Sequence, residues 1–270
     1  MTIIIILLAF FCDKYQGLLK IKHYAWINSY AEGMLRLLPY TKSAAPWWGF
    51  ICIISPVLII ILLFQLVMHT IWFGLAGFIF SVFILYYCLG SSRMSDYLLA
   101  ILSKQTSQPI VVDAEAVNMT TPDSAEIRAI KFMKMTHQEI FAIIFWFILL
   151  GAVGAALYRI LLVLKTYAEK NTSSLHLYLP YFQFCLEVLN WPSVRLLSLC
   201  LSLGGAFTRV FPIWCQGLLG GLSENQQLLA DCTLAATETN APEAIELLFY
   251  RALIICLVVL ALMTLASVIS

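Results

Sequence analysis

Two residues two positions apart, His137 and Glu139, come closest to a catalytic or metal-binding pattern in this chain. An imidazole and a carboxylate can act together as base and acid, or as metal ligands. Side chains two residues apart on a helix point to different faces, so this pair alone does not form a shared site. We therefore interpret them as a solvated helix end that enters a membrane. Glu139 is kept as a candidate acid at the membrane boundary.

Two arginines lie within apolar sequence, Arg159 and Arg195. An arginine at membrane depth costs about 2.5 kcal/mol or more unless it is paired or reaches the surface. Arg159 lies near one end of its apolar run, where its side chain could extend to the headgroups. Arg195 could reach Glu187, Asn190 or a lipid headgroup. Two interpretations stay open for these four residues: a structural clamp, or a pocket for an anionic ligand or lipid.

The remaining reactive residues do not form a recognisable cofactor or metal site. The chain has 8 cysteines, none in a CxxC pair, and most lie in apolar runs. A thiol in such a setting packs as a small hydrophobic group, so we predict buried free thiols, no disulfide framework, and no metal or cofactor. The net charge of +1 also argues against nucleic acid as a partner.

The composition requires a membrane. Hydrophobic residues make up 61% of the chain and charged residues 11%, with a mean hydropathy of +0.90. Soluble domains carry about 25% charged residues, and one anchor on a soluble head cannot produce this average. The sequence therefore predicts an all-α polytopic membrane protein, with about four transmembrane helices plus interfacial or re-entrant helices. The expected partners are the lipid bilayer and another membrane or envelope protein.

The N-terminal third contains the clearest span prediction. Residues 1–46 are expected to form a short membrane-inserted helix followed by a basic amphipathic segment on the membrane surface. Residues 47–90 hold no Asp, Glu, Lys or Arg, a length of 44 residues that is about twice the requirement of one span. We predict a transmembrane hairpin there, with helices near 47–67 and 71–90.

The rest of the chain is expected to alternate between polar and apolar segments. Residues 91–139 are predicted to be a cytoplasmic loop and helix, with a helix-start signal at Thr121-Pro122-Asp123. Residues 140–270 are predicted to contain a transmembrane helix at 140–164, a broken apolar segment at 175–222, an acidic segment at 223–250 and a final transmembrane helix at 252–269. Asn240-Ala241-Pro242-Glu243 is a second helix-start signal.

The basic residues predict the orientation of the hairpin. Segments 13–46 and 91–139 each hold five Lys or Arg, whereas the turn at 68–70 holds none. Basic loops remain in the cytoplasm, so these two segments are expected inside and the turn outside. Lys165 and Lys170 conflict with this pattern, because a single crossing at 140–164 would place them outside.

Two sequence blocks resemble a known family. The first runs from Phe145-Trp146-Phe147 to Leu157-Tyr158-Arg159, and the second is Leu189-Asn190-Trp191-Pro192-Ser193-Val194-Arg195-Leu196. Together they resemble the AmpE family of bacterial inner-membrane proteins, which is linked to β-lactamase induction. That family is distantly related to the CobD/CbiB adenosylcobinamide-phosphate synthases.

The resemblance implies a regulatory or signalling protein of the bacterial inner membrane, linked to envelope or cell-wall sensing. The alternative is a membrane-embedded synthase that uses ATP and an amine. The synthases carry a Gly-Arg-Asp element and an acidic stretch ending in Ser-Asp-Gly. Here that stretch reads Met135-Thr136-His137-Gln138-Glu139, and no Gly-Arg-Asp occurs in the chain. A transporter and a scaffold for another membrane protein remain as further rivals.

Overall fold

The computed structural model describes residues 4–9, 24–37, 46–70, 75–89, 125–170, 174–237 and 242–269. These ranges contain helices and short connections, and no β-strand lies within them. The predicted all-α class is confirmed. The loop and helix start predicted within 91–124, and most of the basic segment predicted within 13–46, lie outside the described residues.

Four of the described helices are long and apolar enough to cross a membrane. They are Trp47–Val67, Glu126–Leu150, Leu175–Gly204 and Ala244–Leu262. The protein is therefore a polytopic membrane protein.

The chain divides into two compact units, each described by itself. Unit 1 comprises residues 1–89 and 142–190, and unit 2 comprises residues 90–141 and 191–270. One boundary falls inside the helix α9 (Leu179–Gly204), whose first half belongs to unit 1 and second half to unit 2.

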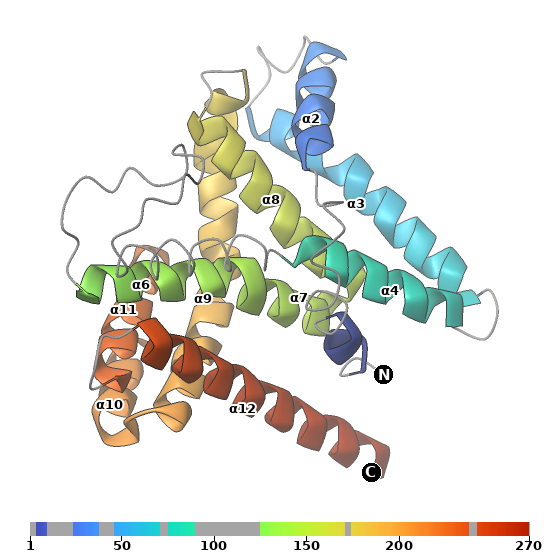
Figure 1. Cartoon of the computed structure of the whole chain (residues 1–270). Coiled ribbons are helices and arrows are strands. Elements are labelled where there is room, and N and C mark those ends of the chain that lie inside the picture. The colour runs from blue at the N-terminus through green and yellow to red at the C-terminus, as the bar shows by residue number, and fades with distance from the viewer. Residues whose placement is uncertain are drawn as a thin grey trace, which may run out of the picture. The chain divides into compact units, whose positions relative to one another are not determined.

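Two adjacent apolar helices of unit 1 lie within the segment predicted as a transmembrane hairpin, and only the first is long enough to cross a membrane. Helix α3 runs over Pro46–Thr70 and helix α4 over Leu75–Cys88. The rings of Phe64 and Phe80 lie 4.7 Å apart, so the last turns of α3 contact the first turns of α4, and the two helices diverge from there (Figure 1). Both helices are uniformly apolar, so lipid contact rather than a polar outer face accounts for their composition.

The predicted single span at 140–164 is wrong, because the chain turns sharply within it. Helix α7 (Ala142–Leu150) ends at Gly151, and α8 (Ala152–Lys170) begins directly after it. Gly151 has φ of 68°, a left-handed conformation that ends an α-helix and favours glycine. Trp146 before the turn and Tyr158 after it both bond to adjacent residues of α9. The two helices therefore fold back on each other (Figure 1).

Helix α8 runs antiparallel to α3 in unit 1. Gly151, at its start, lies against the side chain of Gln65 near the end of α3. The 3-10 turn η4 (Ser174–Tyr178), which follows α8, lies against Gly49 at the start of α3. Helix α2 (Ala25–Leu37) packs on α8 and α3 within the same unit.

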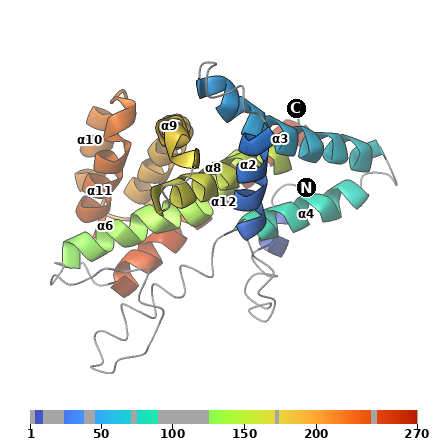
Figure 2. The same cartoon turned by 90° about the horizontal axis from the view of Figure 1, so that it is seen from above.

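Unit 2 contains the second half of α9. The helix entering this unit is α6 (Ala125–Thr136), followed by a π-helical turn, η3 (His137–Phe141). After α9 come α10 (Phe207–Gly217), the short turn η5 (Leu222–Glu224) and α11 (Asn225–Ala236). Helices α10 and α11 lie side by side, as Figure 2 shows.

The broken segment predicted at 175–222 is more helical than expected. Helix α9 continues through Pro192, and Pro212 also lies inside a helix. The break occurs instead at Gly205 and Ala206, between α9 and α10. A proline removes one backbone donor without ending a helix when packing supports the rest of it.

The C-terminal helix is longer than predicted. Helix α12 begins at Pro242, which confirms the helix-start signal there, and extends to Ile269. The acidic segment predicted at 223–250 therefore comprises α11 and the first turns of α12. The final span predicted at 252–269 is the apolar part of this single helix.

Candidate functional site

The guanidinium group of Arg195 binds the connection between α10 and α11 in unit 2. Its Nε donates to the carbonyl of Leu218 at 2.7 Å, and one terminal nitrogen donates to the carbonyl of Gly220 at 2.7 Å. The other terminal nitrogen donates to Oδ1 of Asn225 at 2.8 Å and to the carbonyl of Trp191 at 3.0 Å. Arg195 is 5% exposed. All three of its nitrogens thus bond to protein acceptors, which makes it a structural clamp.

Two indole rings reinforce this clamp. The guanidinium lies 4.1 Å from the centroid of the Trp191 ring, within cation–π range. The indole N–H of Trp191 donates to the carbonyl of Gly220 at 3.1 Å, and that of Trp214 to the carbonyl of Arg195 at 2.9 Å. The predicted partners of Arg195, Glu187 and Asn190, are therefore wrong.

The two family-like blocks contact each other in unit 1. The Tyr158 hydroxyl donates to Oδ1 of Asn190 at 2.7 Å. The indole N–H of Trp146 donates to the carbonyl of Leu189 at 3.1 Å. Tyr158 is completely buried and Asn190 is half-buried, so the bond joins α8 and α9 away from solvent.

Arg159 lies level with the middle of the apolar helix α3 in unit 1. From the contact between Gly151 and Gln65, eight residues along α8 reach Arg159, and eight residues back along α3 reach Val57. Val57 is the middle residue of the apolar helix Trp47–Val67. Arg159 is 2% exposed, so the expectation that its side chain reaches the membrane surface is wrong. The turn at Gly151 explains the error, because it places Arg159 well inside a new helix.

One ring of an aromatic cluster lies against Arg159. Its guanidinium lies 4.4 Å from the centroid of the Tyr24 ring. The Tyr24 hydroxyl donates to the carbonyl of Tyr87 at 2.8 Å, and the two rings meet edge to face at 5.4 Å. The indole N–H of Trp26 donates to the Tyr87 hydroxyl at 2.8 Å. These contacts join the start of α2, the end of α4 and the middle of α8.

His137 and Glu139 are buried, which corrects their prediction as a solvated helix end. They lie in the π-helical turn η3 of unit 2 and are 2% and 6% exposed. Nε2 of His137 lies 2.9 Å from Oγ of Ser193, whose side chain is completely buried. Single π-helical turns occur frequently at functional sites, and a His–Ser pair is a nucleophile–base combination. His137 in η3 is thus joined to α9 through Ser193.

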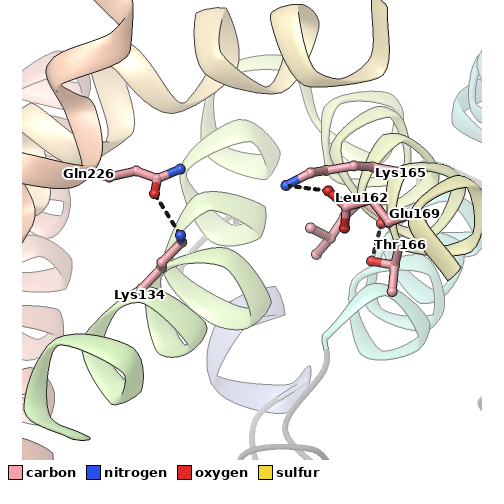
Figure 3. Close-up of polar contacts among 6 residues, drawn as sticks. All are labelled: Lys134, Leu162, Lys165, Thr166, Glu169 and Gln226. Atoms are coloured by element: carbon pink, nitrogen blue, oxygen red, sulfur yellow. Dashed lines mark hydrogen bonds and ion pairs between the residues drawn. The ribbon is translucent and has the colours of Figure 1, made fainter. Parts of the chain in front are cut away.

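Polar contacts at the ends of the helices are of a different kind. In unit 2, Nζ of Lys134 donates to Oε1 of Gln226 at 2.6 Å and joins α6 to α11 (Figure 3). In unit 1, Lys165 and Glu169 form an ion pair of 3.5 Å one turn apart on α8. Such pairs at the surface contribute about 0.5 kcal/mol or less to the free energy of unfolding. They therefore indicate hydrated helix ends rather than a binding or catalytic site.

The four residues predicted as one clamp or pocket divide between the two units. Arg159, Glu187 and Asn190 belong to unit 1, and Arg195 belongs to unit 2, where its acceptors also lie. Glu187 is half-buried on α9.

Sequence reasoning missed Asn225 as an acceptor of Arg195, Ser193 as the neighbour of His137, and Tyr24 beneath Arg159. Each partner is 30 or more residues away, and no local spacing signals such contacts. Of these three partners, only Ser193 had a sequence signal, because it lies inside the second family-like block.

Among the described side chains, no group of three or more His, Cys, Asp or Glu is arranged to hold a metal ion. The seven cysteines within the described ranges are free thiols. No protein family, curated protein or solved structure matches the chain.

Proposed function

We propose that this protein is an AmpE-type regulatory component of the bacterial inner membrane, acting in β-lactamase induction and cell-wall sensing. The observation that carries the proposal is the direct contact between its two family-like blocks, through Tyr158 with Asn190 and Trp146 with Leu189. Two sequence blocks whose residues bond to each other depend on one another. We therefore expect both blocks to occur in the same members of a family. The function itself is inferred from the resemblance.

The polar groups of these blocks suit a regulatory role. Tyr158, Asn190 and Arg195 bond to other helices or connections within their own units. Such bonds fix how helices pack, and a change in packing can pass a signal to a partner. We propose that this partner is another membrane or envelope protein, with the lipid bilayer as the surrounding solvent.

The proposal is tested by deleting the gene in a bacterium that carries it and an inducible β-lactamase. The deletion should change the induced rate of hydrolysis of a chromogenic cephalosporin several-fold, and the wild-type gene should restore it. Asn190→Leu should restore it only in part, because the Tyr158 hydroxyl then loses its acceptor. Gln227→Ala, at an exposed position of α11, is the matched control. An induced rate unaffected by deletion would contradict the proposal.

A membrane synthase is the second candidate, favoured by the buried His137 and Glu139 in η3. Buried ionisable groups in membrane segments are commonly functional. Its test is equilibrium binding of Mg²⁺–ATP to the purified full-length protein in detergent, comparing wild type with Glu139→Gln. Saturable binding that this substitution abolishes would replace the regulatory proposal with an enzymatic one.

A further inference from the structure

Helices α9 and α12 approach each other closely in unit 2. A Cβ added at Gly204 would lie 3.5 Å from the backbone nitrogen of Ala252 and 3.5 Å from Cβ of Arg251. No bulky side chain therefore separates the two backbones at this point. Small residues at a helix crossing are the usual means of such close packing in membranes.

Two cysteines face each other one helical turn from this crossing. Cys200 precedes Gly204 by four residues, and Cys256 follows Ala252 by four residues. The two thiols are close enough to interact. The contact of Gly204 with Ala252 and that of Cys200 with Cys256 fit one antiparallel register. A disulfide needs Cα atoms about 4.4–6.8 Å apart, a separation that only closely packed helices provide.

The two thiols differ in their access to the surroundings. Cys200 is 4% exposed, whereas Cys256 is half-buried. On α12, Ile254 and Val258 are 58% and 51% exposed and share one face, whereas Cys256, two positions from each, points to another face toward α9. The access of an oxidant dissolved in the lipid phase therefore depends on the half-buried thiol of Cys256 itself.

We propose that Cys200 and Cys256 are a redox-active thiol pair that a membrane-dissolved quinone oxidises to a disulfide. The S–S bond forms as both S–H bonds break. The two electrons and two protons pass to the quinone, which leaves as the quinol. The product links α9 covalently to α12 and fixes the close crossing at Gly204.

Charge favours a disulfide over a metal at this position. Two thiolates holding one Cu⁺ ion would leave a net negative charge among apolar side chains, which is costly at low dielectric. A disulfide is neutral and needs no further ligand. This inference is independent of the proposed regulatory function, because it depends only on the contacts of α9 and α12.

The test uses the full-length protein in sealed proteoliposomes under anaerobic conditions, with decylubiquinone as the oxidant. Thiols are then counted by maleimide labelling after denaturation, and disulfides are mapped by peptide mass spectrometry. The wild type should lose two reactive thiols per chain, form one equivalent of quinol and yield a peptide linking Cys200 to Cys256. Cys200→Ser and Cys256→Ser should each abolish the loss.

Cys185→Ser, on the half of α9 that belongs to unit 1, is the matched control and should lose two thiols like the wild type. Cys256→Ala provides a second variant in case a serine hydroxyl disturbs the packing. An unchanged thiol count, or a disulfide between other cysteines, would overturn the proposal. Protection of the pair by added Cu⁺ with no disulfide after quinone treatment would do the same and would identify a metal site.

Discussion

The hydroxyl of Tyr158 on α8 donates a hydrogen bond of 2.7 Å to the side-chain oxygen of Asn190 on α9. The two residues are separated by 32 positions, and Tyr158 is completely buried. A buried bond between neutral groups usually contributes about 1 kcal/mol, and loss of one partner leaves the other unsatisfied. This contact therefore ties the turn at Gly151 to the first half of α9.

The first prediction concerns this bond. Tyr158→Phe should lower the free energy of unfolding in detergent by about 1 kcal/mol, and Asn190→Leu by a similar amount. The double variant should lose less than the sum, because both changes remove the same bond. Thermal unfolding of the four proteins measures the coupling. Strict additivity would show that the bond is not formed in the membrane protein.

The second prediction concerns Arg195. Arg195→Leu removes the donor to Leu218, Gly220, Asn225 and Trp191, and should destabilise the protein by about 3 kcal/mol. The connection between α10 and α11 should then be cut faster by protease, since its carbonyls lose their fixed donor. Arg195→Lys should recover only part of the stability, because an ammonium group cannot reproduce the planar geometry.

Arg209 supplies the control for this variant. It lies on the exposed face of α10 in the same unit. Arg209→Leu should lower the unfolding temperature less than Arg195→Leu does and should leave the protease pattern of the connection between α10 and α11 close to that of the wild type. Equal effects at positions 195 and 209 would argue that charge rather than the clamp is responsible.

The third prediction concerns Gly151. Gly151→Ala places a side chain at φ of 68°, which costs about 1–2 kcal/mol, and its Cβ would lie 3.1 Å from Nε2 of Gln65. The unfolding temperature should fall. Gly33→Ala is the matched control, since a Cβ there meets nothing within 4 Å and Gly33 lies inside α2. That change should raise stability by up to about 1 kcal/mol.

The fourth prediction concerns pH. The hydroxyl of Tyr167 donates to Oε1 of Glu32 at 2.6 Å, and this hydrogen bond, followed by burial and the charge of Glu32, raises the pKa of Tyr167 above 10.0. The folded state therefore retains this proton more strongly than the unfolded state. Its contribution to stability is fully present below pH 10.0 and is lost as pH rises through the raised pKa.

The measurement is the unfolding free energy of the full-length protein as pH increases from about 8 to about 11. Tyr167→Phe should be less stable at the lower pH and should lose less stability as the pH rises. Glu32→Gln keeps an acceptor but removes the negative charge, so the decline should begin at a lower pH. Identical profiles for wild type and Tyr167→Phe would contradict the assignment.

Part of this architecture could be predicted from the sequence because it depends on composition. The charge-free run at 47–90 required two apolar helices, and Pro242 indicated the start of α12. The turn at Gly151 could not be predicted, since its flanking residues are as apolar as a continuous span. The depth of Arg159 and the burial of His137 depended on that turn and on distant partners, so they were missed.

The backbone conformation of Gly151 also bears on Lys165 and Lys170, which a single crossing at 140–164 would place outside the cell. Because α8 returns antiparallel to α3, its end with Lys165 and Lys170 lies level with the start of α3. With the cytoplasmic start of α3 that the basic residues predict, both lysines are then expected on the cytoplasmic side as well. On that prediction the left-handed glycine avoids moving two positive charges outward against the membrane potential, at about 2.3 kcal/mol per charge at 100 mV.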